Sequence, residues 1–557
     1  MAATHLAALR AAARECQLAA ASFSDEQAAE GLTAIDELRA YLLPRPASSS
    51  SQAAALLMQL PFEILSVILS MLGTRELARL AASCRFLRSD APTPQPPPVP
   101  PRQVGLVEAE LRRRADVRGL DVGSSLPEGV ASWVPYLLKR DRRNARMRQA
   151  PLAVGDELSM FVDTEGGLLT CGIDMDCDTP LLGHAEDPDA DPDEPREIGP
   201  PTLVLSMQDR RIISVASSYM HCLALSADGE VYSWGDGYYG VLGLDDEVGR
   251  AVPCRIESLS CIERIAVGPY DTSAAVDQSG KLFTWGRATA LVEGFVEDED
   301  GEVTQLLYSN GLGHELDAET ECQLTPKRVE ALLQERVVDV ALGYSFTLAV
   351  TDAGAVFSFG YCEEGELGHG SLASVVLPRR IEILAQTGRR FVAVAAGNKH
   401  VLALTEEGEL YGWGNEKANG HGSEAAHLGG YERTPRRVAA FGRARIKLVY
   451  AWMYSSCAVT EKGELFTWGY PPVGTSLGHG DDGPQFEPKR VEGLSGVKVA
   501  AAAIGGTHGL AADEDGVVWA FGQRAALGLG ASGPEAIGHV RTPIPIPTLR
   551  VRVLDSP

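Results

Sequence analysis

The stretch that decides the fold is "TEEGELYGWG", residues 405–414, because variants of it occur seven times in the chain. The other six are "DTEGGLLTCG", "SADGEVYSWG", "DQSGKLFTWG", "TDAGAVFSFG", "TEKGELFTWG" and "DEDGVVWAFG". Their final glycines are Gly172, Gly235, Gly286, Gly360, Gly414, Gly469 and Gly522, which are 63, 51, 74, 54, 55 and 53 residues apart. Self-similarity at such a period indicates a repeat architecture.

Each copy predicts a β-hairpin. The glycine at its fourth position, Gly408 in the quoted copy, supplies the positive φ of the turn. A short apolar strand precedes it ("VLAL", 401–404), and the residues after it alternate with period two. Each repeat continues with a Leu-Gly step and ends in a Pro-led strand such as "PKRV", 326–329.

About four short strands per repeat cannot bury their faces alone, but seven repeats stacked in a ring can. We therefore expect an all-β, seven-bladed β-propeller over residues 151–557. We expect the tail "TLRVRVL", 548–554, to form a further strand that closes the ring against the first blade. The two longest spacings hold the insertions 174–195 and 293–310, which we interpret as acidic loops.

The N-terminal part has a different composition. Residues 1–50 are expected to form a helical extension. Residues 57–90 contain "QLPFEILSVILSMLG" (59–73), whose helical projection has an apolar arc of roughly 220°, whereas a surface helix needs little over 100°. Residues 91–150 begin with the spacer "PTPQPPPVPP" and continue as a basic helical linker. The excess apolar surface of 59–73 is interpreted as half of an interface with another protein.

Charge and composition exclude several classes of function. A net charge of −25 argues against nucleic acid as the main partner, because phosphate binding needs a basic face. The 10 cysteines are not closely paired, which is typical of reduced thiols in the cytoplasm or nucleus. No apolar run reaches the 18 residues of a membrane helix, so no membrane contact is expected.

The histidines are interpreted as structural. Two sets recur at fixed repeat positions: His184, His314, His369 and His479 in the Leu-Gly-His step, and His221, His400 and His508 before the apolar strand. No serine, cysteine or aspartate forms a nucleophile motif with them. We therefore expect no catalytic residue and no enzymatic activity.

No metal or cofactor is expected either. Asp174, Asp176 and Asp178 resemble the start of a calcium loop, but Thr179 and Ala185 stand where that loop needs Gly and Glu. Cys171, Cys177 and His184 lack zinc-finger spacing.

Pairs of basic residues occupy one repeat position in four consecutive copies, so they should lie on one arc of the ring. Such an arc is a candidate dock for an acidic or phosphorylated substrate, since Arg forks suit carboxylate and phosphate. The alternative is ordinary solvated charge, or pairing with the acidic insertions. The residues are Lys327, Arg328, Arg379, Arg380, Arg436, Arg437, Lys489 and Arg490.

The repeats resemble those of the regulator of chromosome condensation family. The shared pattern is Gly-x-x-His-x-x-Ala-Leu, a Gly turn, a Trp-Gly strand end, Leu-Gly-His and Pro. Cys171, Phe359 and Phe521 replace the Trp in the first, fourth and seventh copies. This resemblance covers residues 151–557 and implies the seven-bladed propeller.

Residues 57–90 resemble an F-box, the module that binds a Skp adaptor and through it a cullin. The matching residues are Leu60, Pro61, Ile64, Leu65, Ile68, Leu69, Leu72, Leu77, Leu80 and Cys84. An F-box followed by a propeller implies the non-catalytic substrate receptor of a Skp–cullin–F-box ubiquitin ligase, in which the propeller binds a substrate that the sequence does not identify.

Two other functions follow from the propeller resemblance. The founding member of the family is a guanine-nucleotide exchange factor for the small GTPase Ran, so exchange activity or simple scaffolding is the alternative. The plant UV-B photoreceptor shares the fold, but its Gly-Trp-Arg-His-Thr motif is absent here. Of seven Trp, only Trp133 and Trp452 lie outside the repeated phrase.

Overall fold

The computed structural model describes residues 150–174, 179–185, 196–297, 303–309, 311–315, 321–422, 430–470, 477–527, 529 and 538–553. The chain divides into two compact units, with a boundary between Ala145 and Arg146, and all described residues belong to the second. The helical extension, the F-box-like segment and nearly all of the spacer and linker, including the ten adaptor-binding residues named above, therefore lie outside the described residues.

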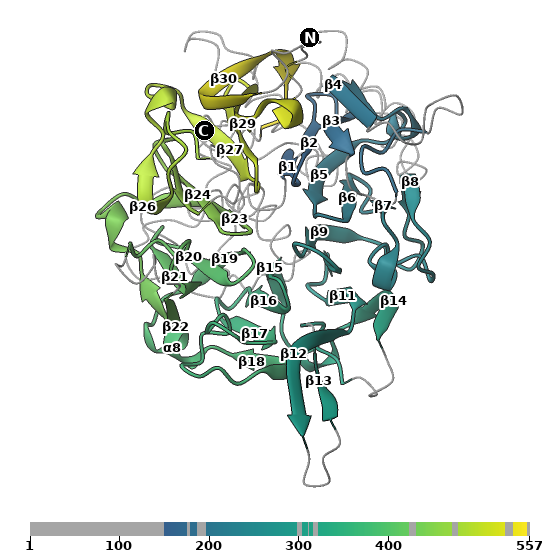
Figure 1. The fold of residues 1–557 in the computed structure, drawn as a ribbon, viewed down its shortest axis with the longest axis vertical. Helices are drawn as coiled ribbons and strands as arrows, with labels where there is room; N and C mark the ends of the chain where they lie inside the picture. Colours follow the sequence, from purple (N-terminus) through teal and green to yellow (C-terminus); the bar gives the residue numbers. More distant parts are fainter. Residues whose placement is uncertain are drawn as a thin grey trace, which may run out of the picture. The chain divides into compact units, whose positions relative to one another are not determined.

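The described residues form a ring of seven four-stranded antiparallel sheets, which confirms the predicted propeller (Figure 1). Blade 1 contains β1 (Leu152–Val154), β2 (Leu158–Val162), β3 (Leu168–Asp174) and β4 (Arg196–Leu203). Blade 2 contains β5 (Ile212–Ser217), β6 (His221–Ser226), β7 (Val231–Gly235) and β8 (Arg250–Arg255). Blade 3 contains β9 (Ile262–Val267), β10 (Thr272–Asp277), β11 (Leu282–Arg287) and β14 (Cys322–Arg328).

The remaining blades repeat this arrangement. Blade 4 contains β15 (Val337–Leu342), β16 (Phe346–Thr351), β17 (Val356–Gly360) and β18 (Val375–Arg380). Blade 5 contains β19 (Phe391–Ala396), β20 (His400–Thr405), β21 (Leu410–Asn415) and β22 (Tyr431–Arg437). Blade 6 contains β23 (Ile446–Trp452), β24 (Ser455–Thr460), β25 (Leu465–Gly469) and β26 (Gln485–Arg490). Blade 7 contains β27 (Val499–Ile504), β28 (His508–Asp513), β29 (Val517–Gln523) and β30 (His539–Arg550).

Short helical turns join the strands. They are η2 (Leu205–Met207), η3 (Tyr238–Gly240), η4 (Glu330–Leu332), α8 (Glu382–Gln386), η6 (Ala439–Phe441), η7 (Glu492–Leu494) and η8 (Arg524–Leu527). None of the helices in the described ranges has the length and apolarity that crossing a membrane requires.

Each repeated phrase forms the hairpin between the second and third strands of a blade. In blade 5, Gly408 has φ +84°, and a Cβ there would lie 2.9 Å from Cβ of Arg445 and 3.0 Å from the Ile446 nitrogen. Leu404 pairs with Leu410 across this turn. The glycine is therefore required both by its conformation and by the close approach of the next blade.

The second acidic insertion is a hairpin rather than a loop, so our prediction was wrong there. β12 (Thr289–Glu297) pairs antiparallel with β13 (Val303–Ser309), and the two project from blade 3 beyond the ring (Figure 1). β-branched and apolar residues flank the central acidic run on both sides, which favours strand–turn–strand. The charge of the segment concealed this pattern in the sequence. Most of the first insertion lies outside the described residues.

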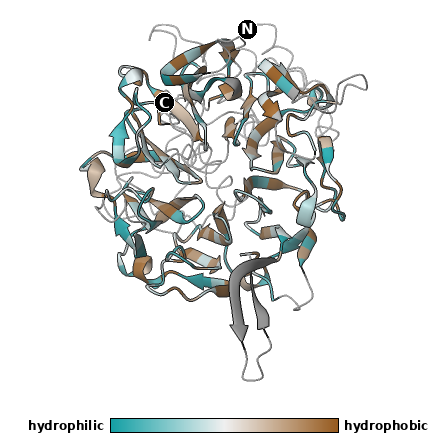
Figure 2. Cartoon of the chain, in the orientation of Figure 1, coloured by the Kyte–Doolittle hydropathy of each residue, from teal (hydrophilic) through white to brown (hydrophobic). Residues whose placement is uncertain are grey.

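The core lies between neighbouring blades. The tryptophans that end the third strands are fully buried, and the indole Nε1 of each donates to a carbonyl of the preceding blade: Trp234 to Leu181 at 2.7 Å, Trp285 to Val241 at 2.7 Å, Trp413 to Glu366 at 2.6 Å and Trp468 to Ala418 at 2.8 Å. Cys171, Phe359 and Phe521 fill the same position in the other blades and are also buried. Hydrophilic residues predominate on outer strands such as β22 and β26 (Figure 2).

The ring closes between blades 7 and 1 without a shared sheet. The Ser159 Oγ of β2 lies 2.8 Å from His508 Nε2 and donates to the Ala526 carbonyl at 2.7 Å. The tail also contacts blade 1, as predicted, because Val551 bridges to Asp163 and the Arg552 N–H donates to the Val162 carbonyl at 3.0 Å. It does so as the end of the fourth strand of blade 7 and not as an additional strand.

Candidate protein-interaction surfaces

The buried histidines connect neighbouring blades. His221, His400 and His508 are fully buried, and the Nε2 of each lies near a serine hydroxyl of the next blade: 2.6 Å from Ser273, 2.7 Å from Ser456 and 2.8 Å from Ser159. Burial lowers the pKa of all three imidazoles to about 3. These neutral side chains are part of the packing between blades.

The second set of histidines bonds within its own blade. The Nε2 atoms of His184, His314, His369 and His479 lie 2.9–3.1 Å from a Thr or Ser hydroxyl on the third strand. Burial, with a smaller contribution from the nearby Lys327 and Arg379 charges, lowers the pKa of His314 and His369 to about 4. The geometry thus assigns both sets a structural role.

Among the described residues, no group of three or more His, Cys, Asp and Glu side chains could hold a metal ion. Cys171 is buried in the core position, and its Sγ lies 3.8 Å from the Ala526 carbonyl. The side chains of the calcium-like stretch 174–178 lie outside the described part of the chain.

A row of tyrosines lies on the face formed by the turns between first and second strands. Tyr219, Tyr270 and Tyr344 come from the same turn position of blades 2, 3 and 4. The rings of Tyr219 and Tyr270 stack with centroids 5.7 Å apart, and Tyr344 meets Tyr270 edge-on at 5.3 Å. Tyr344 is 46% exposed. These three residues are called the tyrosine row below.

Backbone hydrogen bonds connect the turns that carry the tyrosine row to the turns of neighbouring blades at this end of the central channel. The Tyr219 N–H donates to the Pro269 carbonyl at 2.9 Å, and the Tyr344 N–H donates to the Asn398 carbonyl at 3.1 Å. Across this end of the channel, the Tyr270 hydroxyl lies 3.9 Å from the Met453 sulfur. Ring contacts and hydrogen bonds between the turns thus hold the side chains of the tyrosine row in place.

Charged groups surround this face, and several are already paired. Lys399 Nζ lies 2.7 Å from a Glu363 oxygen and 3.5 Å from a Glu364 oxygen. Arg287 pairs with Asp271 at 3.2 Å. Nearby Glu366 is almost fully buried, and burial raises the pKa of its carboxyl to about 7.

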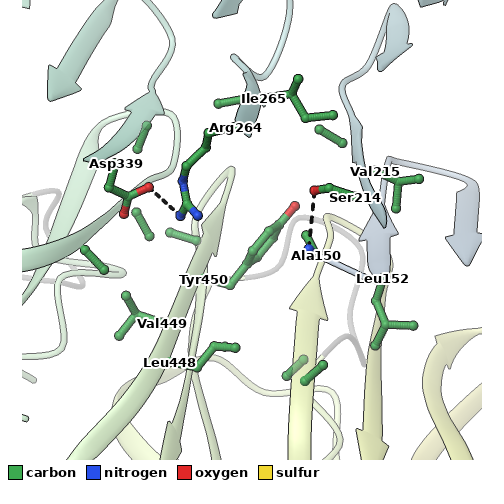
Figure 3. A pocket seen from close by; sticks show the side chains of 18 of the residues that line it. Ala150, Leu152, Ser214, Val215, Arg264, Ile265, Asp339, Leu448, Val449 and Tyr450 are labelled. Atoms are coloured by element: carbon green, nitrogen blue, oxygen red, sulfur yellow. Dashed lines mark hydrogen bonds and ion pairs between the residues drawn. The ribbon is translucent and has the colours of Figure 1, made fainter. Parts of the chain in front are cut away.

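The central channel holds a cavity of about 240 Å³ lined by the first strands of the blades (Figure 3). The Arg264 guanidinium of blade 3 forms an ion pair with Asp339 of blade 4, which also accepts the Val394 N–H of blade 5 at 2.9 Å. Burial raises the pKa of Asp339, against the lowering effect of Arg264. Figure 3 shows Arg264 reaching between Asp339 and Tyr450. This network joins three blades, so we assign it to the packing of the ring.

The predicted basic pairs do lie at the ends of consecutive outermost strands, and most of their side chains are exposed. Several are engaged in ion pairs. Arg328 pairs with Glu330 at 2.8 Å, Arg436 with Glu432 at 3.9 Å, Arg437 with Glu409 at 3.3 Å, Lys489 with Asp481 at 4.0 Å and Arg490 with Glu464 at 3.5 Å. For Lys327, Arg379 and Arg380, the described residues provide no ion-pair partner. Within the described residues, the cations of the arc that lack an ion pair therefore lie at the ends of β14 and β18.

Sequence reasoning missed the tyrosine row. Its signal was present, because each tyrosine stands two residues before the second strand of its blade. Asn398, Met453, Gly506 and Asp156 hold that place in the other blades. Alignment of the copies at that position identifies three neighbouring aromatics on one face.

Comparisons with known proteins agree with this architecture. The regulator of chromosome condensation (RCC1) repeat model matches residues 228–275, 353–404 and 462–512, and a second model of that repeat matches 212–241 and 391–422. The Arabidopsis thaliana protein RUG3, an RCC1 domain-containing mitochondrial protein, is 30% identical over 342 residues, 61% of this chain and 72% of that protein. The chain belongs to the RCC1 repeat family.

Two further proteins are similar to this chain over part of its length. The human E3 ubiquitin-protein ligase HERC2 is 36% identical over 366 residues, which are 64% of this chain but 7% of HERC2. The ultraviolet-B receptor UVR8 of Arabidopsis thaliana is 32% identical over 301 residues, 53% of this chain and 61% of the receptor.

A solved structure shares the fold. Prp20p of Saccharomyces cerevisiae, described together with its binding to Gsp1p and histones, superposes with a TM-score of 0.54 at 22% identity. The superposition covers 72% of this chain and 88% of Prp20p.

Proposed function

We propose that this RCC1-repeat protein is a substrate receptor of a Skp–cullin–F-box ubiquitin ligase. In this proposal the F-box-like segment 57–90 binds the Skp adaptor, and the propeller captures the substrate protein. HERC2, which is 36% identical to this chain over 366 residues, is itself named as an E3 ubiquitin-protein ligase. The chain's own role is non-catalytic, and transfer of ubiquitin belongs to other subunits.

The tyrosine row is the observation that carries the capture step. Tyrosines on rigid supports are favoured at protein interfaces, because they bury a large area at little cost in conformational entropy. Tyr344 is exposed, and Tyr219 and Tyr270 are half-buried. Tyr219, Tyr270 and Tyr344 are held by ring contacts and by backbone hydrogen bonds between turns. The buried polar side chains described above, by contrast, bond within the fold.

Co-expression of the full chain with a Skp adaptor tests the adaptor step. We expect a stable complex that is lost in the double variant Leu60→Ala/Ile64→Asp. Burying an aliphatic side chain contributes about 1.5–3 kcal/mol, and the aspartate adds a buried charge. Ser66→Ala, on the polar side of the same predicted helix, is the matched control and should keep the complex.

Two outcomes would contradict the proposal. In one, the wild-type chain is soluble alone and the adaptor does not co-purify with it. In the other, the chain accelerates nucleotide release from a Ran-like small GTPase, which would establish the exchange-factor alternative.

A further inference from the structure

In blades 2 to 6, one side chain on the third strand decides whether the arginine at the end of the outermost strand is neutralised. Arg255 of blade 2 and the second residue of each basic pair stand opposite an aromatic residue of the third strand in the same register: Arg255 opposite Tyr232, Arg328 opposite Phe283, Arg380 opposite Phe357, Arg437 opposite Tyr411 and Arg490 opposite Phe466. Two residues before each of those aromatics, directly after the hairpin glycine, comes the side chain that faces the arginine.

In blades 2, 5 and 6 that side chain is a glutamate, and an ion pair forms. Arg255 lies 3.1 Å from Glu230, Arg437 lies 3.3 Å from Glu409 and Arg490 lies 3.5 Å from Glu464. The pairing is thus a repeat feature of the outer rim.

Blades 3 and 4 break this rule. Lys281 stands in the glutamate position of blade 3, and Ala355 stands there in blade 4. Arg328 turns instead to Glu330, two residues further along. Glu382 likewise stands two residues after Arg380 in the sequence, but the two form no ion pair in the described structure. The cations of this sector are therefore largely unneutralised.

The same sector is also apolar. Val376 and Leu377 lie in the irregular segment of β18, where the register with β17 shifts, and they are 44% and 39% exposed. Leu372, just before β18, is 37% exposed. These are three of nine large hydrophobic side chains exposed in the described part of the chain. The corresponding segments of blades 5 and 6 are "RTP" and "FEP", with Arg433 and Glu487 exposed.

These residues come from neighbouring elements, because η4, which follows Arg328, packs against β18. We call this group the β18 patch and define it by Lys281, Lys327, Arg328, Arg379, Arg380, Leu372, Val376 and Leu377. Of its five cations, only Arg328 has an ion-pair partner among the described residues, Glu330 at 2.8 Å, whereas the chain as a whole carries a net charge of −25. A local excess of positive charge beside exposed aliphatic side chains favours an acidic partner with apolar residues.

We propose that the β18 patch docks an acidic segment of a partner protein, in which glutamate or aspartate carboxylates pair with Arg379, Arg380 and Lys327 while leucine-like side chains cover Val376 and Leu377. This inference rests on the proposed function in one respect, since it names that segment as part of the captured substrate. It refines the basic arc expected from the sequence, because it restricts the site to blades 3 and 4.

The test is a fluorescence anisotropy titration of the full chain with a labelled synthetic peptide in which glutamate alternates with leucine. We expect saturable binding that weakens as salt is raised. Arg380→Ala should weaken it roughly two- to five-fold, the range of a single exposed charge contact. Arg437→Ala is the matched control, since that arginine already has Glu409, and should leave affinity unchanged.

A second test keeps every residue of the β18 patch and changes the neighbouring Ala355 instead. Ala355→Glu restores in blade 4 the carboxylate that blades 2, 5 and 6 possess, so it should neutralise Arg380 and weaken the peptide to the same degree as Arg380→Ala. Val376→Ser/Leu377→Ser should weaken the glutamate–leucine peptide but not a glutamate–serine peptide. Equal affinity for the wild type, Ala355→Glu and Arg380→Ala would overturn the proposal.

Two further results would also overturn it. A phosphoserine peptide that binds where the glutamate peptide does not would replace the carboxylate assignment. Binding that is seen only after Asp298, Glu299 and Asp300 are changed to amides would mean that the acidic centre of the chain's own β12–β13 insertion occupies the patch. The titration does not involve the Skp adaptor, so its failure is distinct from a failure of the proposed ligase role.

Discussion

At the scale of single residues, the buried ionisable groups couple the stability of the ring to pH. Glu366 accepts the Glu363 and Glu364 N–H groups at 2.9 and 2.8 Å, yet burial still raises the pKa of its carboxyl to about 7. A carboxyl whose folded pKa lies above its unfolded value favours folding when it is protonated. Its contribution is therefore lost as pH rises from about 4.5 through 7.

We predict that Glu366→Gln stabilises the protein at pH 8. The amide oxygen can still accept both N–H groups, and the buried charge is removed. The gain should be about 3 kcal/mol at pH 8 and should fall below about 1 kcal/mol at pH 5, because the pKa is raised from 4.5 to about 7. Denaturant unfolding at both pH values measures it. Glu407→Gln, at an exposed position, is the control, and equal gains in both variants would refute the account.

The three inter-blade histidines act in the opposite direction. Their pKa values of about 3 lie below the usual 6.5, so the unfolded chain takes up protons that the folded ring does not. Stability is then lost as pH falls below 6.5, by about 2 kcal/mol per histidine at pH 5.

We predict that His221→Gln flattens the acid side of the stability profile, although it lowers stability at neutral pH by breaking the bond to Ser273. Thermal unfolding followed between pH 7 and pH 5 measures the slope. A parallel profile for His221→Gln and the wild type would contradict the assignment.

At the scale of elements, the position near the end of the third strand is filled by different side chains: Trp or Phe in blades 2 to 7 and Cys171 in blade 1. Trp413 packs between blades and donates to the Glu366 carbonyl, whereas Phe359 and Phe521 fill the same position without a donor. Blade packing therefore depends first on the filled volume and second on the hydrogen bond.

We predict that Trp413→Phe costs about 1–3 kcal/mol and Trp413→Ala about 3–5 kcal/mol, because only the second leaves a large cavity. Equilibrium unfolding of the two variants measures the difference. Phe359→Trp would test the reverse change, and we expect it to destabilise, since a core without spare volume resists larger side chains. Equal costs for Phe and Ala at position 413 would show that the hydrogen bond dominates.

At the scale of the whole molecule, the joint between blades 7 and 1 differs from the other joints. The chain itself connects blade 2 to blade 3, and His221 with Ser273 adds to that connection. Between blades 7 and 1 the connection consists of side chains and a few backbone contacts, with Ser159 and His508 at its centre.

We predict that Ser159→Ala loosens the ring more than Ser273→Ala does, although the two remove equivalent bonds. Hydrogen exchange should accelerate in β1, β2 and β28–β30 in the first variant, and the acceleration should remain local in the second. Similar exchange maps for the two variants would mean that the joint needs no support from the Ser159 hydroxyl.

The parts predicted from the sequence are those that recur in every copy. Turn glycines such as Gly408, core aromatics such as Trp413 and structural histidines such as His221 repeat because each blade poses the same packing problem. The tyrosine row and Ala355 were missed because they are variations on the repeat, and their meaning depends on which blades are neighbours. The hairpin β12–β13 was missed because its acidic centre dominated the interpretation of the segment. The F-box residues and the docking role of the basic arc stay predictions.

The joint between blades 7 and 1 has a consequence for biosynthesis. Phe161 and Leu152 of blade 1 pack in one cluster with Ala503, Leu510 and Ile546 of blade 7. During translation at about 5–20 residues per second, that side of blade 1 waits roughly 20–80 seconds for its partner to leave the ribosome. An unpaired apolar surface of this duration is a target for chaperones. The yield of folded protein in a cell should therefore depend on chaperone supply more steeply than the stability of the finished ring suggests.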